Sequence, residues 1–335
     1  MIFLAGAHPT LVMAFLIGLW SAFIVSRIGF RIGLADVPNE RSSHQRPVPR
    51  GGGVGIPLAA VLAAVTWTGH VESFLIAALA VSFIALLTDF HELSVKLRFL
   101  LQLVLAGGLV WLYKGELLEL MALQYGIWIV FPVVLLLALF IVAGTNFFNF
   151  MDGINGIAGF QGVVAFGFLG MFALFFKGAE DMALLALVVA AAALGFLFLN
   201  FPNARVFMGD VGSIFLGFLF CGFVIVLFGD IKEFLVLVLF NGVFYVDCVS
   251  TVLLRLYRGE NVLRPHRKHL YQELVHKARW PHYKVTLAYA AAQVVVGVGA
   301  LWLLELSVIY AVLLWAILFL VYWEVRRRFG FFNQV

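Results

Sequence analysis

The sequence predicts an all-α polytopic integral membrane protein with about eleven transmembrane helices. Of its 335 residues, 64% are hydrophobic and only 12% are charged, whereas a soluble domain carries about 25% charged residues. Apolar stretches close to the roughly 20 residues that span a bilayer recur along the whole chain. Lysine and arginine are concentrated in alternate breaks between these stretches, as positive-inside loops require.

The apolar stretches define the expected helices in order. The first is too long for a signal-peptide core and has no charged segment before it, so it is expected to be a retained span. The expected helices are 2–25, 54–69, 73–88, 99–113, 127–144, 157–176, 182–199, 212–228, 234–254, 285–304 and 307–324.

The segments 54–69 and 73–88 decide between eleven spans and ten. Both are short, but the break at residues 69–72 suits a tight turn. Merging them would turn every later loop to the other side and remove the charge bias, which favours eleven.

Charge sets the orientation, with the N-terminus outside. The chain is then a single membrane-embedded domain, 1–335, with cytoplasmic loops at about 26–53, 89–98, 145–156, 200–211 and 255–284 and a tail at 325–335. These segments hold 19 of the 22 basic residues. Basic loops against an anionic inner leaflet explain the net charge of +4 without any nucleic-acid partner. The two cysteines form neither a disulfide framework nor a zinc motif.

Chemistry-bearing side chains gather at the predicted inner face. Four aspartates, Asp36, Asp89, Asp152 and Asp210, lie at its loops, and Asp247 lies within a span, where a charge is costly. The sequence leaves open whether Asp247 pairs with Arg255 or is structural. The predicted outer loops are short and chemically plain, so the active site is expected to face the cytoplasm.

The segment 146–153 is the strongest candidate for a metal site. Asn146, Asn149 and Asp152 recur every third residue, which places them on one side of a helix end or turn. Hard oxygen ligands suit magnesium, with manganese as an alternative. Gly153 lets backbone N–H groups approach a phosphate. Capping of a membrane helix is the structural alternative.

Asp210 stands between two glycines just before a long apolar helix. It is a candidate metal ligand, and the alternative is an anion that offsets the helix dipole. Asp89, at a span boundary and followed by Lys96 and Arg98, is a site candidate or an ordinary helix-terminal carboxylate.

Two basic segments are candidate phosphate sites. The first, 264–269, carries His266, Arg267, Lys268 and His269, which together suit a diphosphate. The second, 41–53, joins cations to a glycine run, with His44 and Arg50 as candidates. The alternatives are a positive-inside anchor and a flexible basic loop.

Five motifs in order resemble those of the polyprenyl-phosphate N-acetylhexosamine-1-phosphate transferases, glycosyltransferase family 4. They are PNERSSHQRPVPRGGG (38–53), TDFHELSVKLRFLLQ (88–102), NFFNFMDGINGIAG (146–159), NFPNARVFMGDVGS (200–213) and RPHRKHLYQ (264–272). The histidine segment resembles the branch that starts O-antigen and related surface polysaccharides. It differs from the three adjacent histidines of the phospho-MurNAc-pentapeptide transferase branch, which is the alternative.

The resemblance implies transfer of an N-acetylhexosamine 1-phosphate from a UDP-sugar to undecaprenyl phosphate in the bacterial inner membrane. By analogy, Asp210 and Asn149 would bind Mg²⁺, and Asp152 would orient the donor or a metal-bound water. His266, Arg267 and His269 would hold the diphosphate, Arg98 and Lys96 the lipid phosphate, and Asp89 would be a base or electrostatic organiser. The sugar is not specified, and a homodimer is one option for the assembly.

Two positions depart from the family pattern. Thr88 stands where the first of two paired aspartates is expected, and Asn155 replaces the second acid of the Asp-Gly-x-Asp-Gly pattern. Two rival classes stay open. One is a transporter, which would explain the number of spans and Asp247 but would place ionisable groups near the midplane. The other, suggested by Thr88, is a non-catalytic homologue that binds lipid.

Overall fold

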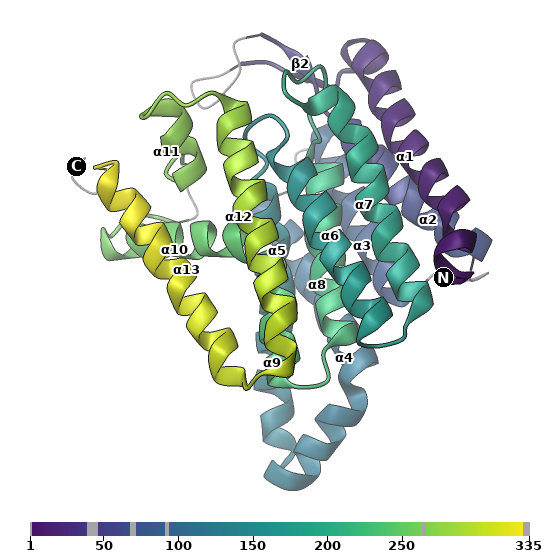
Figure 1. The fold of residues 1–335 in the computed structure, drawn as a ribbon, viewed down its shortest axis with the longest axis vertical. Coiled ribbons are helices and arrows are strands. Elements are labelled where there is room, and N and C mark those ends of the chain that lie inside the picture. Colours follow the sequence, from purple (N-terminus) through teal and green to yellow (C-terminus); the bar gives the residue numbers. More distant parts are fainter. Residues whose placement is uncertain (1, 39–45, 68–71, 91–93, 263–265, 331–335) are drawn as a thin grey trace.

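The computed structural model describes residues 2–38, 46–67, 72–90, 94–262 and 266–330, and these form a bundle of α-helices (Figure 1). Within this part, eight helices are long and apolar enough to span a membrane, and a bent pair supplies a ninth candidate. Two shorter apolar helices, Gly52–Thr66 and Ser73–Leu87, accompany them. The protein is an all-α, multi-pass membrane protein, and each predicted apolar stretch corresponds to helix.

The helix bounds follow the predicted order. The α-helices are α1 Ile2–Ile28, α2 Gly55–Trp67, α3 Ser73–Phe90, α4 Val95–Tyr125, α5 Val130–Phe150, α6 Ile157–Phe175, α7 Glu180–Asn200, α8 Asp210–Leu227, α9 Ile231–Leu239, α10 Gly242–Tyr257, α11 Leu270–His276, α12 His282–Trp302 and α13 Val308–Arg328. Short 3₁₀ turns are η1 Gly29–Ile32, η2 Gly52–Val54, η3 Ile127–Ile129 and η4 Leu303–Glu305. Strands β1 Ala35–Asp36 and β2 Val48–Pro49 pair antiparallel.

Helix α8 is the centre of the bundle. Every residue of α8 except Asp210 and Val226 is buried, as expected for a helix that is apolar on all sides. It packs against α3, α5 and α6. Its first residue, Asp210, therefore lies at the end of the most enclosed helix, surrounded by the ends of its neighbours.

Small residues bring α1 and α7 into close contact. A Cβ atom on Gly18 would overlap the carbonyl oxygen of Ala192, and one on Gly195 would overlap the carbonyl oxygen of Phe15. Buried Ala14 and the glycine at position 18 lie one turn apart on α1. Lipid tails are as apolar as leucine, so such close backbone packing is a main source of helix association in a membrane.

The predicted single span 234–254 is wrong in one respect, because the chain bends by 90° between α9 and α10. The backbone groups freed at the break are met by side chains from other helices. Gln293 of α12 donates to the Leu239 carbonyl (2.9 Å) and accepts from the Val243 N–H (3.0 Å). Gln161 of α6 donates to the Asn241 side chain (2.5 Å). Broken helices survive at membrane depth only when the protein supplies such partners.

Replacing Gln293 with leucine is expected to destabilise the protein by about 1–3 kcal/mol, because it leaves two buried backbone groups unpaired. Thermal unfolding in detergent, followed by loss of the monodisperse peak, would measure this. Gln293→Glu keeps the acceptor for Val243 and, as the neutral acid that burial favours, can still donate to the Leu239 carbonyl, so it should cost less. Equal stability of Gln293→Leu and the unaltered protein would show that the break does not depend on this side chain.

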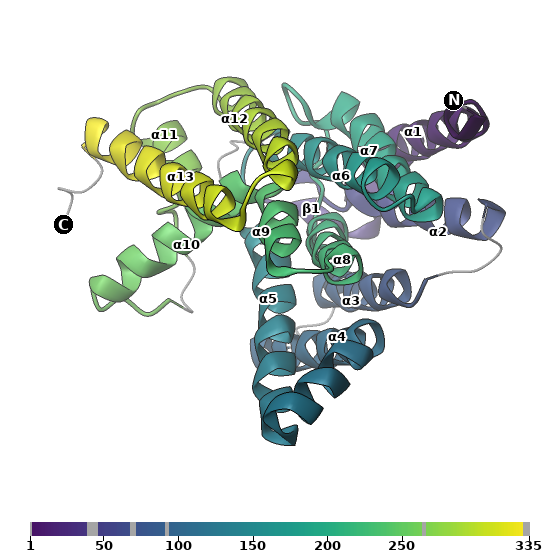
Figure 2. The same cartoon turned by 60° about the horizontal axis from the view of Figure 1, so that its bottom comes forward.

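Several predicted loop boundaries also change. Helix α4 begins after Ser94, whose hydroxyl caps the Leu97 N–H (3.3 Å), and continues far beyond the predicted end at 113. Lys114, predicted to lie in a loop, is within this helix and donates to the Phe228 carbonyl (2.6 Å). The lower ends of α4 and α5 extend beyond the other helices (Figures 1 and 2). The predicted inner loop 255–284 contains the short helix α11.

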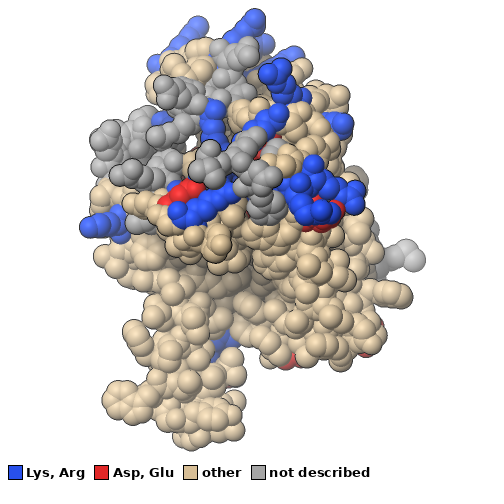
Figure 3. Space-filling model, turned by 90° about the vertical axis from the view of Figure 1, so that its left-hand side faces the viewer, with Lys and Arg blue, Asp and Glu red and all other residues tan. Residues whose placement is uncertain are grey.

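Basic side chains gather at one end of the bundle, here called the polar end. It carries the β1–β2 pair and α11 at the top of Figure 1. Figure 3 shows most lysine and arginine atoms of this face near the top and a largely uncharged surface below. This distribution agrees with the asymmetry in the sequence and identifies the end where charged ligands would be received.

Candidate functional site

The candidate site is built where four segments meet at the polar end: residues 48–53, 146–156, 200–213 and 266–273. Each contains part of a motif predicted from the sequence. Hydrogen bonds and close packing between them, described below, show that segments far apart in the chain are neighbours in the fold. Residues from the end of α5, the start of α8 and the start of α11 contribute the functional groups.

Asn149 and Asp210 are in direct contact. The Asn149 Nδ2 atom donates to Asp210 Oδ1 (3.0 Å) and to Ser213 Oγ (2.9 Å). These bonds use both amide protons and leave Asn149 Oδ1 and Asp210 Oδ2 as oxygen ligands on neighbouring side chains. The structure therefore joins the two residues that the sequence predicts as metal ligands.

Asp152 adds a second carboxylate near Asp210. Burial, and then the negative charge of Asp210, raise the pKa of Asp152 to about 7. A buried carboxylate beside a second carboxylate favours a bound cation between them, because a cation relieves their repulsion. The pair thus supports a cation at this point.

A divalent metal fits this donor set. Within the described residues no group of three His, Cys, Asp or Glu side chains could hold a metal ion. Magnesium does not need one, since it is commonly bound by one or two protein carboxylates together with water and substrate phosphates. Asp210 and Asn149 would hold the ion, and Asp152 lies close enough to influence it electrostatically.

Gly153 has a packing role that the sequence did not reveal. A Cβ atom at this position would overlap the hydroxyl of Tyr271, and that hydroxyl donates to the Phe150 carbonyl (2.9 Å). The glycine therefore lets α11 lie directly against the turn that carries Asp152. Its predicted contact with phosphate stays a prediction.

The first glycine run lies on the Asp210 segment. Gly52 N–H donates to the Phe207 carbonyl (2.8 Å), Gly53 N–H donates to the Met208 carbonyl (3.0 Å), and Phe207 N–H donates to the Pro49 carbonyl (2.8 Å). Arg50 lies between these residues, donates its backbone N–H to the Leu34 carbonyl (2.9 Å) and is half-buried. The predicted cation of the first loop is thus within two residues of backbone that contacts the start of α8.

Asn200 connects the two turns of the site. Its Oδ1 accepts from the Gly156 N–H (2.7 Å), and its Nδ2 donates to the Val206 carbonyl (2.9 Å). Asn200 is the first residue of the motif at 200–213, but the sequence alone did not assign it a role. Its contacts indicate that it holds the Asp152 turn and the Asp210 turn in register.

The basic segment lies beside the end of α5, where the His269 ring is 6.5 Å from that of Phe150, two residues before Asp152. The rings of His266 and His269 are 4.9 Å apart between centroids, and the His269 ring also lies 5.9 Å from that of Tyr271. His266 Nδ1 accepts from the Lys268 N–H (3.2 Å), which leaves Nε2 as the donor of the neutral ring. Burial, followed by the neighbouring charges of His269, Arg255 and Lys268, lowers the pKa of His266 to about 4.

Asp247 is buried and supports this segment. Its carboxylate accepts from the Leu270 N–H (2.9 Å), the Tyr271 N–H (3.3 Å) and the Tyr289 hydroxyl (2.7 Å). His269 Nδ1 lies 3.4 Å from Asp247 Oδ1. The sequence left the partner of Asp247 open, and the structure shows that it binds the backbone at the start of α11.

Arg255, the alternative partner for Asp247, has other contacts. It binds Glu260 (3.2 Å) and the carbonyls of Asn261 (2.6 Å) and Val262 (3.1 Å). Glu260 also accepts from Lys268 Nζ (2.5 Å). These contacts shape the chain just before the basic segment.

Asn146 faces a different neighbour from Asn149. Its Nδ2 donates to Gln102 of α4 (2.9 Å) and to the Val142 carbonyl (2.7 Å). Arg98, one turn before Gln102, is half-buried, and its Nε atom has no hydrogen-bond partner within the described part of the chain. Lys96 is exposed at the start of α4. Lys96 and Arg98 thus lie at the start of α4, close to the part of α5 that carries Asn146.

Two predicted site residues lie outside the described part. One is His44. The other is Asp89, whose backbone lies in the last turn of α3 but whose side chain is outside the described part. Arg267 is half-buried within the basic segment. The departure at Thr88 likewise falls on a side chain outside the described residues.

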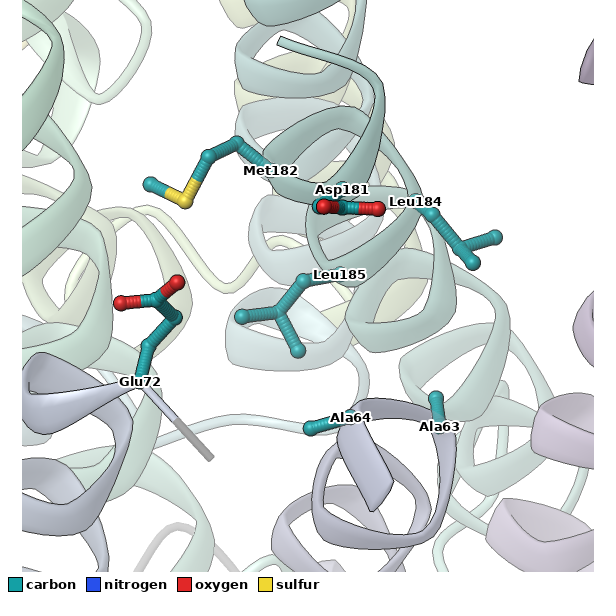
Figure 4. A pocket seen from close by; sticks show the side chains of 7 residues that line it. All are labelled: Ala63, Ala64, Glu72, Asp181, Met182, Leu184 and Leu185. Atoms are coloured by element: carbon teal, nitrogen blue, oxygen red, sulfur yellow. The ribbon is translucent and has the colours of Figure 1, made fainter. Parts of the chain in front are cut away.

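A small, partly open pocket lies far from this chemistry. Its volume is about 330 Å³ with the adjoining open solvent included, and it is lined by Ala63, Ala64, Glu72, Asp181, Met182, Leu184 and Leu185 (Figure 4). These residues belong to the end of α2, the start of α3 and the start of α7, opposite the polar end. None of the predicted site residues lines it, and its walls are mainly apolar.

Comparisons with known proteins point to one family. The family model described as "Glycosyl transferase family 4" matches residues 71–228, which include Asn149, Asp152 and Asp210.

Curated relatives match most of the chain. It is 28% identical to the "Probable undecaprenyl-phosphate N-acetylglucosaminyl 1-phosphate transferase" of Bacillus subtilis (strain 168), over 93% of this chain and 88% of the relative. It is 28% identical to the "Undecaprenyl-phosphate alpha-N-acetylglucosaminyl 1-phosphate transferase" of Escherichia coli (strain K12), over 87% and 82%. A Yersinia pestis relative of the same name is 32% identical over 62% of this chain and 59% of its own length.

Proposed function

We propose that the chain is a member of glycosyl transferase family 4, whose model matches residues 71–228, and that it transfers an N-acetylhexosamine 1-phosphate from a UDP-sugar to undecaprenyl phosphate. The products are the polyprenyl diphosphate-linked sugar and UMP. We assign the reaction to the first membrane step of O-antigen or another cell-surface polysaccharide. The relatives' names mention N-acetylglucosaminyl groups, so GlcNAc is the first sugar to test.

The observation that carries the proposal is the contact between Asn149 and Asp210, with Asp152 and the basic segment beside it. These groups come from three segments yet form one polar site at the end of an apolar bundle. Such a site can receive a charged nucleotide from water and a phosphate on a lipid from the bilayer.

We place the polar end at the cytoplasmic face of a bacterial inner membrane. Its excess of basic residues supports this orientation. Counting the bent pair as one span and including both shorter apolar helices gives eleven spans, with the N-terminus outside. The sugar nucleotide would then be met on the side where it is made.

The chemistry is a phosphoryl transfer between two anions. An oxygen of the acceptor phosphate attacks the phosphorus attached to the sugar, and the bond from that phosphorus to the UMP oxygen breaks. Mg²⁺, or Mn²⁺, bound by Asp210 and Asn149 would neutralise phosphate charge and stabilise the leaving group. The protein must hold both anions close and in line, since positioning supplies much of such catalysis.

The remaining residues divide between the two substrates. Arg267, Lys268 and His269, with the N–H of neutral His266, would hold the donor diphosphate. Arg98 and Lys96 would bind the lipid phosphate, and Arg50 would add charge beside Asp210. The acceptor phosphate is already an anion at pH 7, so the reaction does not need a strong base. Asp152 and Asp89 are better suited to organising charge than to abstracting a proton.

The ionisable side chains argue against the transporter alternative. The carboxylates of the site lie at helix ends and turns, rather than near the middle of the bundle. Asp247 is engaged by α11 instead of facing a central pathway. The second alternative, a non-catalytic homologue, is suggested by Thr88. An activity assay distinguishes it from an enzyme.

The test uses the full chain in membranes with undecaprenyl phosphate, magnesium and a panel of UDP-N-acetylhexosamines. UMP release and a lipid-linked sugar are measured together. We expect turnover with one donor, GlcNAc first and then FucNAc or QuiNAc, and complete loss with EDTA. No turnover with any donor, from protein that is folded and monodisperse, would reject the enzyme and favour a lipid-binding role.

A further inference from the structure

A buried ion pair connects the C-terminal helix to the basic segment. Arg326 of α13 lies 2.6 Å from Glu273 of α11, and their side chains are 1% and 3% exposed. Arg326 is among the largest fully buried side chains in the described part of the chain. Neither residue lies within the matched family region at 71–228.

The Arg326 guanidinium also reaches the basic segment itself. Its Nη1 atom donates to the Lys268 carbonyl (3.1 Å) and to the Tyr322 hydroxyl (2.8 Å). Its fork therefore holds the backbone between the side chains of Arg267 and His269, as well as the first turn of α11. Lysine, a single point charge, lacks this planar fork.

Asp247 holds the same segment through other backbone groups. It accepts from the N–H groups of Leu270 and Tyr271 and lies beside His269. The segment Lys268–Glu273 is thus held both by a buried anion on α10 and by a buried cation on α13. Helix α10 itself lies across the bundle because of the 90° bend (Figures 1 and 2).

Buried charges of this kind are a poor source of stability. Removing two charges from water costs several kcal/mol per ion, and a well-packed apolar pair is often equally stable. Here two buried charged side chains bind backbone atoms of one six-residue segment. This is expected if the geometry of that segment has to be fixed.

We propose that Arg326 and Asp247 are positioning residues, which hold the basic segment 266–269 in the geometry that binds the diphosphate of the sugar nucleotide. The inference rests on the proposed function for the identity of that ligand. Neither residue is assigned contact with substrate. Both act through the backbone and through His269.

The decisive variants replace either Arg326 alone or both Arg326 and Glu273. Arg326→Met removes the buried partner of Glu273, which then keeps only Lys277 (2.9 Å) at its other oxygen, and should lower the thermal stability. Arg326→Met combined with Glu273→Met removes both charges and should restore most of that stability. The double variant still lacks the fork that holds the Lys268 carbonyl. Arg327→Met is the control, since Arg327 follows on the same helix but is exposed and pairs with Glu324.

Two readouts distinguish positioning from stability. The first is the Kd for UDP with magnesium, measured by calorimetry on the full chain in detergent. The second is the KM for UDP-GlcNAc against the KM for undecaprenyl phosphate. For the double variant we expect about tenfold or greater weakening of UDP binding and a similar rise in the KM for UDP-GlcNAc. The KM for the lipid should stay within about twofold, because Arg98 and Lys96 are unaltered.

Asp247→Asn tests the contacts that α10 makes with the segment. It keeps one acceptor oxygen but removes the charge beside His269, and should weaken UDP binding in the same direction. Arg326→Lys, which keeps the charge without the fork, should fall between the unaltered protein and the double variant.

The outcomes separate the two hypotheses. Unchanged UDP affinity in a stable double variant would overturn the inference, as would a lower rate without any change in KM. If the unaltered protein binds UDP but turns over no donor, the proposed function fails, while weakened UDP binding by the variants would still support the positioning role. If the unaltered protein neither binds UDP nor turns over, both are rejected.

Discussion

Replacing Asp210 with alanine is expected to abolish UMP release, with at least a hundredfold loss of turnover (about 3 kcal/mol in the transition state). Asp210 supplies a carboxylate in contact with Asn149 at the start of α8, where a cation and two phosphates would meet. The fold should persist, because an acid at a helix N-terminus contributes only about 0.3–1 kcal/mol. Steady-state UMP release from membranes with matched protein levels measures the effect.

Two controls make this result specific. Asp210→Asn keeps an acceptor for Asn149 but loses the charge, so it should fail almost as completely if charge is required. Asp230→Ala removes an acid from a helix start at the opposite end, where its side chain caps the Glu233 N–H (2.8 Å). It should cost about 1 kcal/mol of stability and leave turnover intact. Turnover of Asp210→Ala within threefold of the unaltered protein would remove Asp210 from the metal site.

Replacing Gly195 with alanine is expected to destabilise the protein by about 2–4 kcal/mol, because the new methyl group meets the backbone of α1 rather than a movable side chain. Helices α1 and α7 would have to separate along their whole contact. The effect would appear as a lower unfolding temperature and as loss of monodisperse protein in detergent.

The matched control is the same substitution where space is open. A Cβ atom at Gly107 of α4 has no neighbour within 4 Å. Gly107→Ala should therefore be neutral, or stabilise by up to about 1 kcal/mol through its better helix propensity. If both alanine variants unfold at the same temperature, the close approach of α1 and α7 is not what holds them together.

The helices could be predicted because a span leaves a strong local signal. Segments such as 157–176 and 182–199 are long, apolar and bounded by polar residues, and the structure places α6 and α7 there. The break at Phe240–Asn241 leaves no such signal. It depends on Gln161 and Gln293, which are 80 and 50 residues away from the groups they bind.

The core of the site was also accessible from the sequence. Asn149 and Asp210 are hard ligands at the ends of two predicted spans, so a common face implied that they were close, and a hydrogen bond now joins them. Their role in binding metal stays a prediction. The supporting residues were not accessible, because Arg326 is indistinguishable in sequence from an ordinary positive-inside anchor. Only the packing of α13 against α10 shows that it is buried.

The break between α9 and α10 has a consequence for biogenesis. Helix α9 has nine residues and is about 14 Å long, roughly half of the hydrocarbon thickness. It cannot be integrated as an independent span, and its open backbone groups stay unsatisfied until α12 supplies Gln293. The translocation machinery must therefore shelter this part of the nascent chain until Gln293, 54 residues after Leu239, has been synthesised. The site is completed only when the last two helices have entered the membrane.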